Sequence, residues 1–292
     1  MKMKRSLLLP LLTPVLLLAG CNQEPEGQPV LRTEIGSGVA EDIPGQAPQN
    51  KADDTGAIEE TEQSERASVC RDVTFEQVLL THCTADPAIH RIVTALSGAD
   101  GKPYRSLSKL ASSRGADAKS VAFAVNGGMF NGEGKPIGYY VQNRNRTKEL
   151  NRSDGPGNFH LMPNGVFFGT GGTWQVHTSD YFYRMIGDRP DFGTQSGPML
   201  VIDGKLHPKI ADNGPSKAIR NGVGIGTDGR AHFVIANAPL SFGVLARFYR
   251  DELKVPNALF LDGNVSALWD PATGRMDAGA ALGPLIVIEN RE

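Results

Sequence analysis

Four short apolar runs in this chain each border a turn that combines glycine with a polar side chain. The turns are Asn126-Gly127-Gly128, Gln195-Ser196-Gly197, Arg220-Asn221-Gly222 and Asp262-Gly263-Asn264. Glycine permits positive φ and close backbone approach, and loops at strand ends are where scaffolds commonly place their chemistry. Any one of these turns alone is more simply a tight corner. Four of them together predict a strand-rich fold whose strand ends meet at one site.

The remaining pattern also favours strands. Residues 73–84 and 89–97 have strand-forming composition around a turn at Asp86-Pro87, so we expect them to pair. Apolar residues recur at helical spacing over 106–114 and 241–253, where Ser241 is a candidate N-cap. Two Asp-Gly turns predict hairpins, of 198–202 with 205–206 and of 223–227 with 231–236. Further strands are expected at 121–126, 137–142, 166–168, 174–178, 258–262 and 285–288.

The predicted strands outnumber the predicted helices, and one strand–helix–strand unit accompanies the hairpins. The fold class that follows is α+β, with a mixed, strand-rich sheet and a few helices, rather than a doubly wound parallel sheet. About 225 residues follow the N-terminal segment described below, which is enough for a single domain.

Residues 1–20 have the pattern of a secretory signal peptide. A positively charged start precedes the apolar stretch 7–18, which is shorter than the ~20 residues that a membrane-spanning helix needs. The stretch ends in Leu18-Ala19-Gly20-Cys21, which resembles a bacterial lipobox. We therefore interpret 1–20 as a lipoprotein signal peptide and expect lipid on Cys21. This predicts a lipid anchor in the bacterial envelope, facing the periplasm, and Asn22 slightly favours the outer membrane.

Residues 21–68 are expected to form a disordered acidic tether. From residue 22 onward this segment has eleven acidic and three basic residues and no aromatic side chain. Such a segment cannot bury enough apolar surface to offset its ordering entropy. The domain at 69–292 then carries 24 basic and 21 acidic residues. This balance is compatible with an anionic substrate and too weak to predict binding to nucleic acid.

Two further cysteines, Cys70 and Cys83, stand thirteen positions apart. In an oxidising compartment we expect them to form a disulfide. A metal-binding pair is less favoured, because no other cysteine completes a thiolate site. The histidines show neither H-x-H nor H-E-x-x-H spacing, so we expect no zinc site and no cofactor.

Asp262 and Arg220 are the candidate catalytic residues. Asp262 ends an apolar strand, where a carboxylate is poorly solvated and its position needs a reason. The simpler interpretation of Asp262 is a turn-forming Asp-Gly. Arg220 offers a permanently charged fork that suits phosphate or carboxylate, although a structural ion pair would use the same residue.

Other polar residues of the turns are candidates for binding a substrate. The glycines after Asn126 could present backbone N–H groups as an anion nest. Ser196 could donate to an oxyanion or be a plain turn residue, and it lacks the G-x-S-x-G context of a hydrolase nucleophile. His160 could face the same cleft or have a structural role. The expected substrate-binding residues are Asn126, Gly127, Gly128, Gln195, Ser196, Gly197, Asn221, Asn264 and His160.

The order and spacing of these motifs, over about residues 70–289, resemble the phosphodiester glycosidase family and its bacterial branch in particular. One departure is Asn264, where many members of the mammalian type carry another glycine after Asp-Gly. The motifs are Asn126-Gly127-Gly128-Met129-Phe130, Pro136-Ile137-Gly138, Gly157-Asn158-Phe159, Pro163-Asn164-Gly165-Val166-Phe167, Gln195-Ser196-Gly197-Pro198-Met199, Arg220-Asn221-Gly222-Val223 and Leu261-Asp262-Gly263 with Ser266.

The resemblance implies a phosphodiester glycosidase-like domain over 69–292 that cleaves a sugar-1-phosphodiester at the glycosidic bond. The phosphomonoester that leaves has a second pKa near ~6, so it needs less protonation than a sugar alkoxide. The paired carboxylates of most glycosidases are then not compulsory. Arg220 would bind phosphate, and Asp262 would aid water or stabilise positive charge on the sugar.

Two other functions are compatible with the sequence. A non-catalytic envelope lipoprotein that binds anionic glycans would keep Arg220 and the glycine turns but would need no carboxylate. A metal-dependent phosphodiesterase would break the P–O bond instead, and the sparse set of metal-ligating residues argues against it.

Overall fold

The computed structural model describes residues 31–33 and 67–291. The predicted signal peptide, Cys21 and nearly all of the predicted tether lie outside the described residues. In the part of the chain that is described, no helix combines the length and the apolar character needed to cross a membrane.

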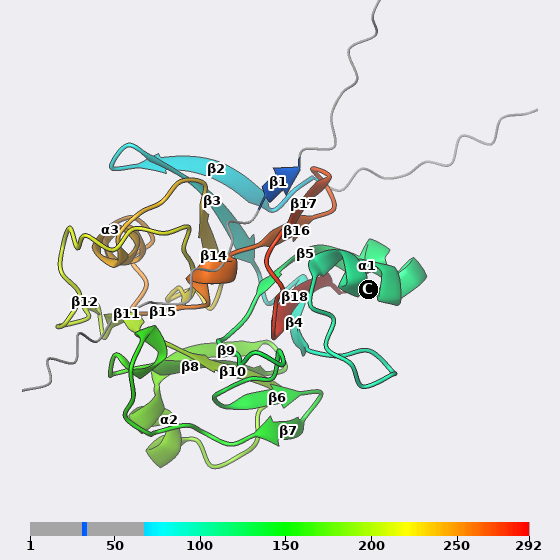
Figure 1. The fold of residues 1–292 in the computed structure, drawn as a ribbon, viewed down its shortest axis with the longest axis horizontal. Helices are drawn as coiled ribbons and strands as arrows, with labels where there is room; N and C mark the ends of the chain where they lie inside the picture. The colour runs from blue at the N-terminus through cyan, green and yellow to red at the C-terminus, as the bar shows by residue number, and fades with distance from the viewer. Residues whose placement is uncertain (1–30, 34–66, 292) are drawn as a thin grey trace, which may run out of the picture.

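Three antiparallel sheets pack around a common centre (Figure 1). In spatial order, the six-stranded sheet consists of β1 (Leu31–Thr33), β17 (Arg275–Ala278), β16 (Leu268–Asp270), β5 (Val121–Asn126), β18 (Leu285–Asn290) and β4 (His90–Ala95). The five-stranded sheet consists of β7 (Asn145–Lys148), β6 (Tyr140–Gln142), β10 (Phe192–Ser196), β8 (Gly165–Thr170) and β9 (Thr173–Thr178). The seven-stranded sheet consists of β12 (Lys205–Leu206), β11 (Met199–Ile202), β15 (Asn257–Phe260), β13 (Asn221–Ile225), β14 (Ala231–Ala236), β3 (Val78–Ala85) and β2 (Cys70–Phe75).

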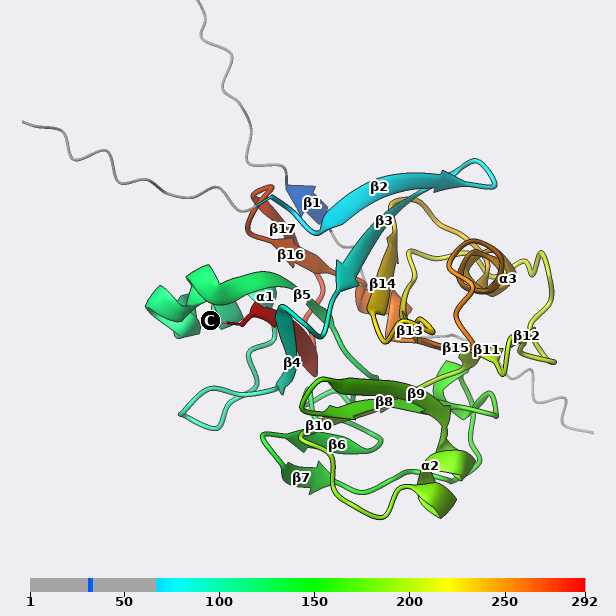
Figure 2. The same ribbon diagram turned by 180° about the vertical axis from the view of Figure 1, so that it is seen from behind.

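Each of three short α-helices covers the outer side of a different sheet (Figures 1 and 2). Helix α1 (Leu107–Arg114) packs Leu107 and Leu110 on the six-stranded sheet. Helix α2 (Ser179–Met185) packs Phe182 on the five-stranded sheet. Helix α3 (Phe242–Arg247) packs on the seven-stranded sheet and continues as a π-helical turn, Phe248–Glu252. Short 3₁₀ turns occur at Gly115–Ser120, Asn158–His160 and Gly263–Val265.

Aromatic side chains from all three sheets meet at the centre of the molecule. The ring of Phe233 in β14 lies 5.4 Å from that of Phe123 in β5 and 5.8 Å from that of Phe167 in β8. Phe167 in turn lies 5.1 Å from Phe192 in β10. Such edge-on ring pairs add to the stabilisation that burial supplies. One core therefore joins the three sheets and fixes how their strand ends meet.

The expected α+β class, rich in strands and with few helices, is confirmed. The expected mixture of parallel and antiparallel strands needs correction, because every pairing of the described strands is antiparallel. The reason lies in the strand–helix–strand unit β14–α3–β15. Its two strands run in the same direction, but β13 lies between them and pairs with both.

The predicted pairing of 73–84 with 89–97 is wrong. Residues 70–85 themselves form a hairpin of β2 and β3, with a turn at Glu76 and Gln77. Both turn residues have positive φ, as a two-residue hairpin turn requires, but neither is a residue type that signals such a turn. Strand β4 pairs with β18 in the other sheet instead.

The expected disulfide between Cys70 and Cys83 is confirmed. The two cysteines face each other across the β2–β3 hairpin. The side chain of Ser106 caps α1 by accepting the N–H of Lys109, and Ser241 caps α3, as expected, by accepting the N–H of Val244. The second predicted helix is thus confirmed, with its last turn π-helical.

Candidate active site

The four glycine turns come together where strands of all three sheets end. Strand β15 ends at Phe260, which pairs with Gly222 near the start of β13. The N–H of Phe260 donates to the carbonyl of Pro198 at 3.1 Å, so the turn that precedes β11 reaches the same place. The fourth turn follows β5, and Asn126 joins it to the others. The expectation that these turns meet is therefore correct.

A buried amide network links β5 and β13 to the loop at residues 262–267. The side chain of Asn126 is 1 % exposed, donates to the carbonyl of Asp262 at 2.8 Å and accepts the N–H of Ala267 at 3.0 Å. The side chain of Asn221 donates to Oδ1 of Asn126 at 2.8 Å. Two asparagines from different sheets thus hold the loop that carries the candidate catalytic carboxylate.

Asp262 is partly buried directly after the apolar end of β15. Burial raises the pKa of Asp262 to about 6, and the N–H of Asn264, which donates to the carboxylate, opposes part of that rise. The carboxyl group therefore changes its protonation state close to neutral pH. Such a group is suited to accept a proton from water during a reaction.

Arg220 is 2 % exposed and tightly held. Its Nε donates to the carbonyl of Leu240 at 3.0 Å, and its Nη2 lies 3.2 Å and 3.0 Å from the carbonyl and hydroxyl of Ser216. Its Cζ lies 3.6 Å from the ring centroid of Phe242. These contacts fix the plane of the guanidinium. Arg220 thus has a structural role through two carbonyls, a hydroxyl and an aromatic ring, and the ion pair considered from sequence stays a prediction.

Extension of the β13–β15 register by two positions predicts that Arg220 and Asp262 lie opposite each other. The N–H of Leu261 donates to the carbonyl of Asn221 at 3.1 Å, so the next positions outward are Arg220 and Asp262. Side chains alternate along a strand, so both residues follow the face on which Phe260 meets α3. Opposite residues of an antiparallel pair have Cβ atoms about 4.5–5.5 Å apart. The fold therefore brings the two candidate catalytic residues to one strand end.

The structure corrects the expectation that Gly127 and Gly128 form an anion nest. The N–H of Gly127 donates to the carbonyl of Pro284 at 2.7 Å, and that of Gly128 to the hydroxyl of Thr194 at 3.1 Å. A Cβ on Gly128 would overlap the carbonyl of Gln195. The glycines instead let the turn after β5 pack closely against β10.

Gln195 and Gly197 also support the site rather than line it. Oε1 of Gln195 accepts the N–H groups of Tyr139 and Asn151, both at 2.9 Å, and Nε2 donates to the carbonyl of Asn151 at 2.7 Å. A Cβ on Gly197 would lie 2.7 Å from Cβ of Asn164, so this position requires glycine. These residues brace the strand end, contrary to the expectation that they bind substrate.

Ser196 differs from its two neighbours. It is 0 % exposed, and its hydroxyl has no hydrogen-bond partner among the described residues. Buried hydroxyl groups nearly always have a partner, so this one has capacity to bind a water molecule or a ligand. Its place at the end of β10 keeps it a candidate for substrate binding.

Of the remaining predicted residues, Asn264 contacts Asp262, whereas the described contacts of His160 are with its own loop. Asn264 is exposed, and its backbone contacts the carboxylate of Asp262. Nδ1 of His160 lies 2.7 Å from the carbonyl of Ser153, and its ring packs on Phe159. In the described contacts, His160 bonds to its own loop, so its structural role is supported.

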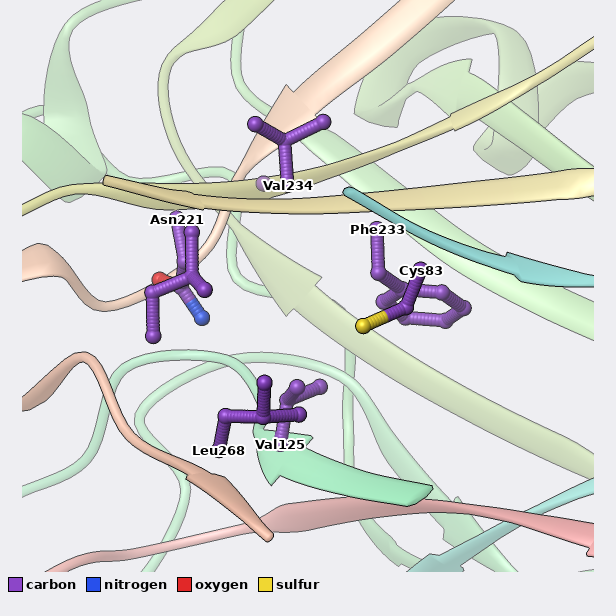
Figure 3. Close-up of a pocket in the computed structure, with 8 residues that line it drawn as sticks. Cys83, Val125, Asn221, Phe233, Val234 and Leu268 are labelled. Atoms are coloured by element: carbon purple, nitrogen blue, oxygen red, sulfur yellow. The ribbon is translucent and has the colours of Figure 1, made fainter. Parts of the chain in front are cut away.

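A small apolar gap beside Asn221 lies between strands of the seven-stranded and six-stranded sheets (Figure 3). Asn221 and Cys83 lie on one side of it, and Val125 and Leu268 lie on the other. The cavity does not admit a water-sized sphere. It is therefore a packing gap between the sheets and not the place where a substrate binds.

Within residues 67–291, no group of three or more His, Cys, Asp or Glu side chains is arranged to hold a metal ion. The groups that the site offers for chemistry include Asp262, Arg220 and the hydroxyl of Ser196.

Sequence reasoning missed several residues that shape the site. Ser266 was part of a recognised motif, but its position within 3.3 Å of Oδ1 of Asn221 was not expected. The hydroxyl of Thr194 accepts the N–H of Gly128, and the ring of Phe242 stacks on the guanidinium of Arg220. The period-two alternation of β10 could have pointed to Thr194, which shares a strand face with Ser196. Nothing in the local sequence predicts that Phe242 stacks on Arg220.

Comparison with known proteins defines the class of this protein. Residues 119–274 match the family model described as phosphodiester glycosidase, and this range contains Asn126, Arg220 and Asp262. The chain therefore belongs to the phosphodiester glycosidase family.

Particular relatives agree with that class. The uncharacterized protein YigE of Escherichia coli (strain K12) is 32% identical over 186 residues, which make up 64% of this chain and 72% of YigE. The fold is similar to that of the catalytic domain of zebrafish N-acetylglucosamine-1-phosphodiester alpha-N-acetylglucosaminidase, auto-inhibited by its pro-peptide. The TM-score is 0.50 over 76% of this chain and 82% of the zebrafish chain, with 15% identity. The likeness to the zebrafish protein is one of fold.

Proposed function

We propose that this protein is an envelope lipoprotein hydrolase that cleaves a sugar-1-phosphodiester at the glycosidic bond. Membership of the phosphodiester glycosidase family supports a glycosidase type of function. One observation carries the proposal furthest: Asp262, with a pKa raised to about 6, lies at a strand end opposite Arg220. That end is where strands of all three sheets meet.

The proposed reaction needs one group that accepts a proton. The Asp262 carboxylate takes a proton from a water molecule while the water oxygen forms a bond to C1 of the sugar. The bond between C1 and the phosphate oxygen breaks, and the electron pair leaves with the phosphate. The products are a free sugar and a phosphomonoester. The phosphomonoester is a good leaving group because its second pKa is near ~6, so no general acid is needed.

Arg220 contributes positive charge where the phosphate charge grows. Its guanidinium is held in one orientation by Ser216, Leu240 and Phe242, so it needs no reorganisation during the reaction. Preorganised charge acts more strongly in a site that excludes water. The hydroxyl of Ser196 and the exposed side chain of Asn264 are the proposed polar contacts of the substrate.

The N-terminal sequence supports the proposed location. The lipobox at Cys21 would anchor the protein in the envelope, and residues 22–30, which precede β1, would link this anchor to the domain. Substrates that fit this location are sugar phosphodiesters of the envelope or capsule.

The test is turnover of a panel of sugar-1-phosphodiesters by the parent protein and by Asp262→Asn. The proposal expects release of free sugar by the parent, and turnover about 10²–10⁴-fold slower in the variant, with binding retained. Asp203→Asn is the matched control, because Asp203-Gly204 forms an Asp-Gly turn of the same sheet, between β11 and β12. It should keep parental turnover. Binding of anionic glycans without any turnover by the parent would instead support the non-catalytic alternative.

A further inference from the structure

We propose that Asn126 is a positioning residue, whose side-chain amide holds both ends of the 262–267 loop and acts on the reaction through Asp262 rather than through the substrate. This inference rests on the proposed function. It also replaces the expectation from sequence that Asn126 binds the substrate itself.

The hydrogen bonds of Asn126 occupy its whole amide group. Its Nδ2 donates to the carbonyl of Asp262 at 2.8 Å and lies 3.5 Å from Oδ1 of Asn221. Its Oδ1 accepts the N–H of Ala267 at 3.0 Å and the Nδ2 of Asn221 at 2.8 Å. A side-chain amide has two donor hydrogens and one oxygen with two acceptor sites. No capacity is left over for a sugar or a phosphate.

The orientation of this amide is fixed by backbone groups. The N–H of Ala267 can only donate, and the carbonyl of Asp262 can only accept. Oδ1 of Asn126 must therefore face Ala267, and Nδ2 must face Asp262. Asparagine amides are otherwise easily assigned the wrong way round, so two backbone partners of opposite character matter here.

The loop has little else to hold the backbone of Asp262. The carboxylate of Asp262 accepts the N–H of Asn264 in the 3₁₀ turn that follows it, and this bond holds the side chain of Asp262 rather than its carbonyl. Gly263 lies against the ring of Phe260, where a Cβ would come within 2.6 Å. Val265 packs into the core under α1. The loop thus runs from β15 of the seven-stranded sheet to β16 of the six-stranded sheet, and Asn126 bridges its two ends.

Loss of this bridge changes the surroundings of the Asp262 carboxyl group. The carbonyl of Asp262 and the N–H of Ala267 would both need new partners, and water is the nearest available one. The carboxyl group would become more solvated, and its pKa would fall toward the ordinary aspartate value, because burial is the main cause of its rise. Displacement of a reacting group by about 1 Å can slow a reaction by about 10²-fold.

The experiment uses the full-length protein and two readouts. Carbon-13 NMR of labelled aspartate, assigned by comparison with Asp262→Asn, measures the pKa of Asp262 in the parent and in Asn126→Ala. Steady-state kinetics on a sugar-1-phosphodiester give kcat and KM for the parent, for both single variants and for the double variant. Thr94→Val is the control, because Thr94 is also buried and its hydroxyl donates to the carbonyl of Val141 rather than to a residue of the loop.

The proposal expects a lower pKa of Asp262 in Asn126→Ala and an unchanged pKa in Thr94→Val. It also expects kcat to fall about 10–100-fold, with KM within about threefold of the parent. In the Asp262→Asn background, the Asn126→Ala change should cost little more, because its effect passes through the carboxylate. Should Asn126→Ala fail to fold, Asn126→Ser takes its place with the same readouts.

Three results would overturn the proposal: an unchanged pKa of Asp262, a large rise in KM with unchanged kcat, or full additivity of the two changes. Failure of the proposed function gives a different result, because the parent would then hydrolyse no sugar-1-phosphodiester. The NMR titration would still test the bridge in that case.

Discussion

The burial that raises the pKa of Asp262 for its proposed role as a base also lowers the stability of the folded protein when the carboxyl group is charged. Burial disfavours its charged form, so the folded protein holds a proton on this group up to a pH of about 6. The unfolded chain releases that proton near the ordinary aspartate value of about 3.9. Below about pH 4 the group is neutral in both states, so it does not lower the free energy of unfolding. That free energy falls as the pH rises from about 4 through 6, because the unfolded chain is charged more readily than the folded protein.

Asp262→Asn should therefore make the protein more stable and less active. Above about pH 6 we expect a gain of about 1–3 kcal/mol in the free energy of unfolding, because asparagine has no charge to bury. The gain should vanish near pH 4, where the parent carboxyl group is neutral. Chemical denaturation at several pH values measures this difference. An equal effect at pH 4 and pH 8 would contradict the buried titrating role of Asp262.

Arg220→Lys should weaken both stability and turnover. A lysine cannot reproduce the contacts with Leu240 and Ser216 together or the stacking on Phe242. We expect a loss of about 1–3 kcal/mol of stability. We also expect a higher KM and a lower kcat, since charge grows on the departing phosphate. Denaturation and steady-state kinetics measure the two effects, and Arg250→Lys, at a half-buried pair with Asp251, is the matched control. Parental KM and kcat in a folded Arg220→Lys would remove Arg220 from the reaction.

The residue types at the site were predictable, but their roles were only partly so. A polar residue beside glycine at the end of an apolar run is visible in sequence, and Asp262 was identified in this way. The hydrogen bonds that hold Asn126, Gln195 and Gly128 reach across more than forty positions, as those of Gly128 with Thr194 and of Gln195 with Asn151 show. Such contacts leave no local signal, so supporting residues were taken for substrate-binding ones.

At the scale of elements, hairpins with typical turn residues were predicted well. The Asp-Gly turns at 203 and 228 separate β11 from β12 and β13 from β14, as expected. The turn at Glu76 and Gln77 was missed because its residues do not favour positive φ, and a longer strand was predicted in place of the hairpin. Capping serines marked the starts of both predicted helices, since capping is a local interaction.

A buried histidine pair links β3 to β14. Nε2 of His82 lies 3.0 Å from Nδ1 of His232. Burial lowers the pKa of His82 to about 4, with His232 and then Arg71 adding to the effect. Burial also lowers the pKa of His232, which Asp228 partly opposes and to which Arg230 and Arg71 add. Both rings are therefore neutral in the folded protein near neutral pH.

This pair should make the seven-stranded sheet sensitive to acid. The unfolded histidines take up protons below about pH 6.5 while the folded ones resist, so stability falls as the pH drops from about 6.5 toward 4. His82→Gln, which cannot titrate, should reduce the stability lost between pH 7 and pH 4.5 by about 1 kcal/mol or more. Thermal melts over this range measure it, with His160→Gln as the control. An unaltered pH dependence in His82→Gln would contradict the assignment.

At the scale of the whole molecule, three sheets share one core, and their strand ends form one site. The fold class could be predicted from the number of expected strands, but the order of the strands within each sheet could not. Neighbouring strands of the six-stranded sheet can be far apart in sequence: β18 pairs with β4, and the paired residues Asn290 and His90 are 200 positions apart. Pairings of this kind are specified by the packing of the core rather than by local sequence.

Cys21→Ser should release the protein from membranes. A lipoprotein signal peptide needs the cysteine thiol to receive its lipid, so the variant would remain unlipidated. We expect the parent to partition into the detergent phase of a cell extract and the variant to shift to the aqueous phase. Phase separation followed by immunoblotting measures this. Equal partitioning of the two proteins into detergent would contradict a lipid anchor on Cys21.

The most direct test of the central claim is the position of bond cleavage. A sugar-1-phosphodiester that the protein hydrolyses is incubated with it in oxygen-18 water, and both products are analysed by mass spectrometry. Attack of water on C1 predicts that the label enters the sugar and that the phosphomonoester carries none. Label in the phosphomonoester would show cleavage of the P–O bond and would contradict a glycosidase reaction at this site.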